Sequence, residues 1–134
     1  MKHIPALLMA MSLLFSPCAF STENTSEHAR KTLEIYRTII EVDTSKAKGN
    51  TPKVARYLAG ELIEAGIPTE DVEVVLVDGF AALIARYRGN GSSGEKPILF
   101  LGHIDVVEAN AEDWERPPFK LTKDDTNFYA RGTI

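Results

Sequence analysis

The sequence predicts an α/β fold in which helices flank a mixed β-sheet, and three observations lead to this prediction. Two stretches with helical periodicity come first, at residues 26–42 and 51–65. Two β-type stretches follow at residues 72–77 and 80–88, and residues 97–101 are apolar throughout. Helices followed by strands, one of them fully apolar, are typical of a sheet with helices packed on it. The length of 134 residues fits one domain.

Residues 1–21 have the layout of a secretory signal peptide, with a basic start at Lys2, an apolar stretch from Ile4 to Phe15, and small residues near Ser21. The apolar stretch has about 12 residues, whereas a membrane-spanning helix needs about 20. We therefore expect cleavage, a secreted or periplasmic location and no stable membrane span. Residues 22–134 then form the N-terminal portion of the folded domain.

Cys18 is the only cysteine, and it lies inside the predicted signal peptide. Cleavage after Cys18 or Ala19 is an alternative, and an uncleaved anchor, a buried helix or a lipoprotein at Cys18 fits less well. Without residues 1–21, 14 basic and 19 acidic residues remain, a net charge of −5. This acidity argues against a nucleic-acid partner, which needs a basic face. The single cysteine excludes a disulfide framework or thiolate site, so His, Asp or Glu must hold any metal.

Two amphipathic helices are expected before the strands. The first runs from a cap at Ser26 to about Val42. Its apolar face is formed by Leu33, Tyr36, Ile39 and Ile40. The second begins at Thr51-Pro52, because the threonine hydroxyl can accept a free backbone N–H and proline loses nothing at the first helical position. It ends before Gly66, since glycine suits the left-handed conformation that terminates helices.

The strands differ in the burial that their patterns predict. Residues 72–77 are rich in β-branched side chains, residues 80–88 alternate, and the Asp-Gly pair between them predicts an antiparallel hairpin. Residues 97–101 form a continuous apolar run, which indicates a strand buried on both faces. Residues 128–130 form a weaker strand.

Gly102-His103-Ile104-Asp105 follows the predicted buried strand. In open α/β sheets, sites gather beyond the carboxyl ends of strands. Residues two apart in extended chain point to the same side, so His103 and Asp105 lie together while Ile104 faces the core. We predict that His103 is a metal ligand and Asp105 a catalytic-site carboxylate that orients its ring. The alternative is a local hydrogen bond on the surface, which is common for such a triplet.

Several spaced elements accompany this motif. The string Leu99-Phe100-Leu101-Gly102-His103-Ile104-Asp105-Val106-Val107 is followed by Trp114, then by Pro117-Pro118-Phe119, and then by Tyr129-Ala130-Arg131-Gly132-Thr133. Residues 99–134 thereby resemble the N-terminal signature of the M20 family of metallopeptidases, which includes carboxypeptidases, dipeptidases and amino-acid deacylases. The upstream helices and hairpin are similar to the start of the family's catalytic domain, so the resemblance covers nearly all of residues 26–134.

The resemblance implies a zinc-dependent hydrolase of amide or peptide bonds, in which His103 binds zinc and Asp105 orients it. The family site holds two zinc ions, for which Co²⁺ is a substitute, bridged by an aspartate and a water or hydroxide. That aspartate is expected directly after Ile134, and the general-base glutamate and the lid or dimerisation domain further on. The chain is therefore expected to be a truncated, inactive N-terminal part. The full-length protein would act on small peptides or N-acyl amino acids, as a monomer or homodimer.

Two alternatives remain. The chain can be a small secreted binding module or inactive remnant in which His103 and Asp105 only bond locally. It can also be a related zinc aminopeptidase, although the downstream Trp, Pro-Phe and Arg-Gly elements favour the M20-like group. Within either hydrolase, Trp114 and Phe119 are expected to pack the loop after the motif, and Arg131-Gly132 to shape the following turn.

Overall fold

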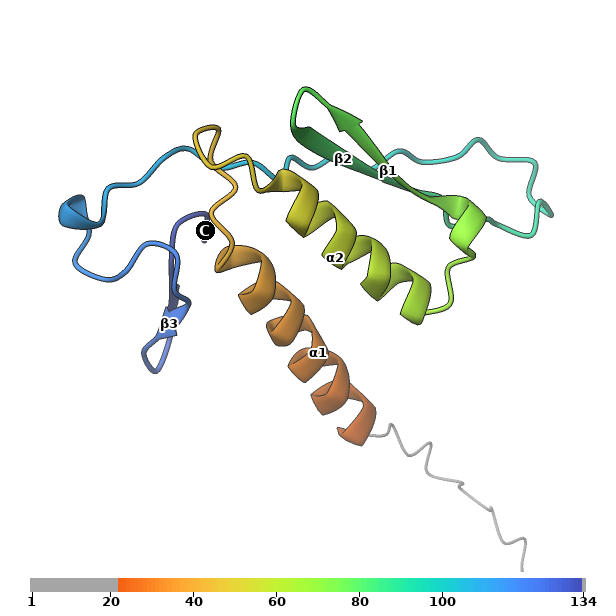
Figure 1. Cartoon of the computed structure of the whole chain (residues 1–134). Coiled ribbons are helices and arrows are strands. Elements are labelled where there is room, and N and C mark those ends of the chain that lie inside the picture. The colour runs from red at the N-terminus through yellow and green to blue at the C-terminus, as the bar shows by residue number, and fades with distance from the viewer. Residues whose placement is uncertain (1–21, 134) are drawn as a thin grey trace, which may run out of the picture.

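The computed structural model describes residues 22–133, and the predicted signal peptide lies outside this range. The chain forms two helices followed by two small hairpins that are separated by a long irregular stretch (Figure 1). The elements are α1 (Thr22–Ile40), α2 (Thr51–Glu64), β1 (Val72–Val77), β2 (Phe80–Ala85), β3 (Thr122–Lys123) and β4 (Phe128–Tyr129). The α/β class is confirmed. None of the described helices combines the length and apolar character that crossing a bilayer requires.

The first helix is longer at its start than the sequence analysis predicts. It begins at Thr22, so Ser26 lies inside the helix and is not its cap, and it ends at Ile40 rather than Val42. The reason is that residues 22–25 are polar, and apolar periodicity cannot mark a helical turn that has no apolar face. At the other end, the amide of Val42 donates to the carbonyl of Ile39, which closes a tighter turn.

The second helix has the predicted bounds but a different start. Thr51 is its first residue and Asn50 precedes it, with no side-chain capping bond. The Thr51 hydroxyl instead accepts a hydrogen bond from the backbone N–H of Ala81, at 3.0 Å, and Thr51 is buried. The predicted capping role of Thr51 is therefore wrong, because the hydroxyl joins α2 to the hairpin. Gly66 has a φ of 98°, which confirms the predicted left-handed end of the helix.

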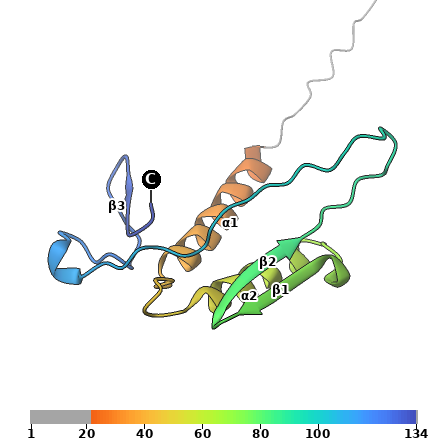
Figure 2. The same ribbon diagram turned by 90° about the horizontal axis from the view of Figure 1, so that it is seen from above.

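Strands β1 and β2 form the predicted antiparallel hairpin, with Val77 opposite Phe80. Asp78 and Gly79 both have positive φ, as a two-residue type I′ turn requires. The hairpin packs on α2 (Figure 2), whose buried residues are Thr51, Val54, Ala55 and Ala59. This layer contains three of the five buried apolar residues of the described chain, and the other two, Leu121 and Ala130, lie beside the second hairpin.

Asp71 fixes the far end of the hairpin. Its carboxylate accepts two hydrogen bonds from the Arg88 guanidinium, at 2.6 and 2.7 Å, and its carbonyl accepts one from the amide of Arg86. The Asp71 side chain is only 1 % exposed. These hydrogen bonds from Arg88 lower the pKa of Asp71, although burial opposes the shift. The pair therefore joins the 3-10 turn at Thr69–Asp71, just before β1, to the segment after β2.

The first helix is joined to both parts of the structure by polar contacts. Lys31 forms an ion pair with Glu61 of α2 at 2.7 Å, which lowers the pKa of Glu61 and raises that of Lys31. Near its end, Arg37 donates to the carbonyl of Leu121 and Glu41 accepts from the amide of Leu121. This second contact holds the β3–β4 hairpin against the end of α1.

The strand predicted at residues 97–101 is wrong. These residues form no strand, and Ile98, Leu99, Phe100 and Leu101 are 80–93 % exposed. A doubly buried strand needs a neighbour on each edge and a cover on each face, and the described residues supply none of them here. For the same reason the described chain has two separate hairpins instead of one mixed sheet, with a single parallel bridge between Ser45 and Val106.

Replacing Thr51 with valine should lower the free energy of unfolding by about 1–3 kcal/mol, because the part-buried amide of Ala81 loses its acceptor. Urea denaturation followed by circular dichroism measures the change. The matched control is Thr32→Val, since Thr32 is an exposed position of α1. Equal stabilities of the two variants would show that the hydroxyl does not hold the hairpin.

Replacing Arg88 with methionine should destabilise the chain most above pH 4. The lowered pKa of Asp71 means that its ion pair stabilises the fold above the unfolded-state pKa of about 3.9 and is lost as the pH falls through the folded-state pKa. The difference in Tm between the parent and Arg88→Met should therefore narrow below about pH 4. Arg86→Met is the control and should change Tm less, and a difference that stays constant with pH would contradict the assignment.

Candidate functional site

The motif His103-Ile104-Asp105 lies in the irregular stretch and separates two grooves. One groove, of about 840 Å³, is lined by β2, the start of α2 and residues 99–105. The other, of about 570 Å³, is lined by the end of α1, the first half of α2, residues 103–107 and residues 131–133. The motif residues line both grooves.

The structure brings His103 and Asp105 together. The ring atom Nδ1 of His103 lies 2.8 Å from the backbone carbonyl oxygen of Asp105 and 3.3 Å from its carboxylate oxygen Oδ1. Both acceptors belong to the residue that the sequence analysis names as the orienting group, and the backbone acceptor is the nearer. Ile104 between them is half-buried, whereas His103 and Asp105 are exposed.

This geometry determines which ring nitrogen is available. Because both neighbours of Nδ1 are acceptors, a neutral ring must carry its proton on Nδ1 and donate it. The lone pair then lies on Nε2, for which no hydrogen-bond partner is found among the described residues. A histidine held in this way is ready to bind a metal through Nε2.

Among the described residues, possible metal donors do not gather around His103. No group of three or more His, Cys, Asp or Glu residues that could hold a metal lies within residues 22–133. His28 lies exposed on α1. Stable zinc sites have three or four protein ligands, and residues 22–133 do not bring that many together.

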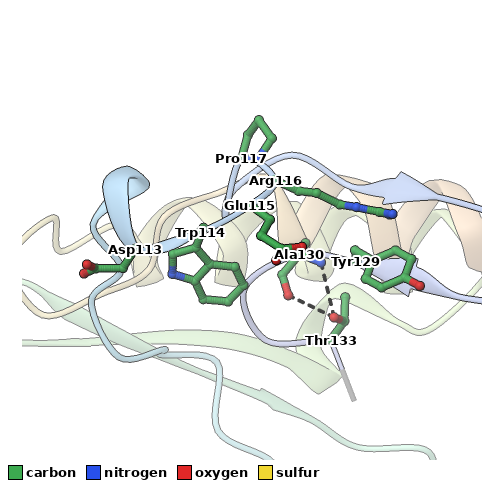
Figure 3. Close-up of a pocket in the computed structure, with 8 residues that line it drawn as sticks. All are labelled: Asp113, Trp114, Glu115, Arg116, Pro117, Tyr129, Ala130 and Thr133. Carbon is green, nitrogen blue, oxygen red and sulfur yellow. Dashed lines mark hydrogen bonds between the residues drawn. The ribbon is translucent and has the colours of Figure 1, made fainter.

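Trp114 lines a third pocket, of about 660 Å³, that does not include the motif (Figure 3). The Arg116 guanidinium stacks over the ring of Tyr129, 3.8 Å from its centre. The hydroxyl of Tyr129 donates to Asp124 at 2.6 Å, and this bond, together with backbone N–H donors, holds the pKa of Asp124 far below its usual range. Trp114 is 39 % exposed, so it packs the loop less completely than expected, whereas Phe119 is half-buried in the groove beside α1.

The sequence analysis missed a contact between the motif segment and the turn near residue 131. The Arg131 side chain donates from Nε to the carbonyl of Val107 at 2.9 Å. The two residues are 24 positions apart, and no periodicity or spacing rule links an arginine to a distant backbone carbonyl. The one sequence feature that pointed to Arg131 was the series of spaced motif elements that contains the Arg-Gly pair.

Replacing Asp105 with alanine should leave the neutral His103 ring protonated at Nδ1, because the nearer acceptor is the backbone carbonyl. The ¹⁵N chemical shifts of the two ring nitrogens report the tautomer, and His28 in the same spectrum is an internal control. A change to the Nε2-protonated tautomer would show that the carboxylate alone orients the ring.

Comparison with known proteins identifies relatives of this chain. No family model matches it, and no solved structure matches it. It is 33 % identical over 111 residues to a probable succinyl-diaminopimelate desuccinylase of Staphylococcus aureus, covering 81 % of this chain and 25 % of the relative.

Two further relatives agree with this match. The chain is 36 % identical over 107 residues to the acetylornithine deacetylase of Vibrio campbellii, which covers 75 % of this chain and 26 % of the relative. It is 29 % identical over 121 residues to an N-fatty-acyl-amino acid synthase/hydrolase of Xenopus tropicalis, covering 84 % of this chain and 23 % of the relative. The chain thus spans about a quarter of the length of its curated relatives, which are enzymes of the M20 family, and it is related to that family.

Proposed function

We propose that this chain contributes one metal ligand to a zinc-dependent hydrolase of amide bonds. The observation that supports the proposal most directly is the geometry of His103. Its Nδ1 is directed at Asp105, and its Nε2 has no hydrogen-bond partner among the described residues, at the boundary of two grooves. In this proposal His103 binds zinc through Nε2, and Asp105 fixes the ring in the tautomer that binds metal.

Zinc fits the chemistry of this donor. A neutral imidazole nitrogen is a common zinc ligand, and two acceptors on Asp105 hold the proton on the opposite nitrogen. When bound, zinc would polarise the carbonyl of the scissile amide and favour attack by water. The other ligands would come from parts of the protein beyond residues 22–133, since these residues bring no further donors into a metal-binding group. We therefore propose that the 134-residue chain alone is inactive.

The names of the relatives point to a class of substrate. They describe the removal of a succinyl group, the removal of an acetyl group, and the synthesis or hydrolysis of an N-fatty-acyl amino acid. Each name places an acyl group on an amino-acid derivative. We propose that the whole protein hydrolyses the amide bond of a small N-acyl amino acid, with small peptides as the alternative substrate.

The location and assembly of the whole protein are also proposals. The signal-peptide pattern of residues 1–21 supports export to the periplasm or the medium. A homodimer through a further domain follows from the family resemblance alone. Fractionation of cells that express the protein tests the proposed export. Recovery of the protein in the membrane fraction would contradict it.

Replacing His103 with alanine should abolish amide hydrolysis by the complete gene product that contains this sequence, because a zinc ligand is lost. Replacing Asp105 with alanine should lower kcat/KM by about 10–100-fold, because the carboxylate that raises the basicity of the zinc-binding ring is lost, although the backbone carbonyl keeps the tautomer. Release of amino acid from N-acetyl and N-succinyl amino acids measures both changes.

The control variant for this experiment is His28→Ala, which removes an exposed histidine from α1. Its activity should equal that of the parent. Full activity in His103→Ala would overturn the proposed function. Activity against peptides but not against N-acyl amino acids would support the hydrolase and reject the substrate class.

A further inference from the structure

The segment that follows His103 is bonded to the rest of the described chain, whereas residues 98–101 before it are exposed and belong to no strand. Val106 forms a parallel bridge with Ser45 in the loop after α1. The carbonyl of Val107 accepts the hydrogen bond from Arg131. Upstream, the side chains of residues 98–101 are 80–93 % exposed. The position of His103 is therefore determined from its carboxyl side.

The arginine that makes this contact extends from a well-fixed turn. The backbone N–H of Arg131 donates to the carbonyl of Pro118, and Ala130 next to it is buried. The Thr133 hydroxyl donates to the carbonyl of Ala130 at 2.9 Å and accepts from its amide at 3.2 Å (Figure 3). The backbone that carries the guanidinium is thus held by a closed turn.

The turn also approaches the motif segment through its glycine. Gly132 has a φ of 86°, and a Cβ built there would lie 3.4 Å from Cγ1 of Val106 and 3.9 Å from Cδ1 of Ile40. The end of α1, the motif segment and the turn therefore meet at one point. Among the described residues, no carboxylate lies within ion-pairing distance of Arg131, so its hydrogen bond to Val107 is the polar contact of its side chain.

We propose that Arg131 is a positioning residue for His103: by holding the carbonyl of Val107, it fixes the His-Ile-Asp segment against the turn. Its importance for catalysis rests on the proposed function, because only a metal-binding His103 needs a fixed position. Its effect on the geometry of His103 does not rest on that function. The hydrogen bond of Arg131 goes to the carbonyl of Val107 and not to the ring of His103.

The test uses the 134-residue chain and needs neither zinc nor activity. In Arg131→Met, the backbone amide order parameters of Val106 and Val107 should fall from about 0.85, the value of rigid backbone, to below about 0.6. The His103 ring should lose its preference for the Nδ1-protonated tautomer. The hydrogen bond between Thr51 and Ala81 should persist, which shows that the core remains folded.

Two further variants make the result specific. Arg116→Met removes an arginine that stacks on Tyr129 and has no contact with the motif, so its His103 signals should match the parent. Arg131→Lys keeps a donor and a positive charge, so it should restore the tautomer at least in part. The proposal is overturned if Arg131→Met leaves Val106, Val107 and the His103 ring unchanged. It is also overturned if Arg131→Met unfolds the chain and the folded Arg131→Lys variant shows no tautomer preference at His103.

The two proposals fail separately. If His103 keeps its dependence on Arg131 but His103→Ala leaves hydrolysis intact, the proposed function is wrong and the positioning contact stands. If His103→Ala abolishes hydrolysis while Arg131→Met changes no signal of the motif, the hydrolase stands and Arg131 has no positioning role.

Discussion

The contact between Arg131 and the carbonyl of Val107 is the constraint on which the geometry of the candidate site depends. It joins the turn near the end of the described chain to the segment that contains the histidine, and Val106 beside it bridges to the loop after α1. Arg131 is held by its turn, and the loop that contains Ser45 is held by a hydrogen bond from the amide of Ser45 to the carboxylate of Asp43. The attachments of Val106 and Val107 therefore position His103, although no strand precedes it.

The apolar run at residues 98–101 is exposed because the described chain provides no element that covers it. Four large apolar side chains in a row are rarely left in water, because burying each would stabilise the fold by about 1.5–3 kcal/mol. The groove between this run and β2 has the apolar lining that a neighbouring element would cover. The chain spans about a quarter of its curated relatives, and the exposed run agrees with the proposal that the activity belongs to a longer protein.

Local signals in the sequence predicted the two helices and the first hairpin, but contacts between distant residues were not predicted. The Asp78-Gly79 turn was predicted because it requires only two adjacent residues with positive φ. The contact of Thr51 with the hairpin was not predicted. Its hydroxyl can accept a hydrogen bond from its own helix or from Ala81, and packing decides between them. The pairing of His103 with its neighbour followed from extended-chain geometry. The contribution of Arg131 needed the three-dimensional arrangement, as did the exposure of the run that had been predicted as a buried strand.

The most direct test of the central claim is a zinc titration of the 134-residue chain, followed by the ¹⁵N signals of the histidine rings. The account predicts that zinc shifts Nε2 of His103 and leaves Nδ1 bonded to Asp105. It also predicts weak binding, far from the 10–16 kcal/mol or so of complete structural zinc sites, because one histidine supplies one ligand. Coordination of zinc through Nδ1 of His103 would contradict the account. So would zinc binding that reaches saturation without any shift of the His103 ring signals.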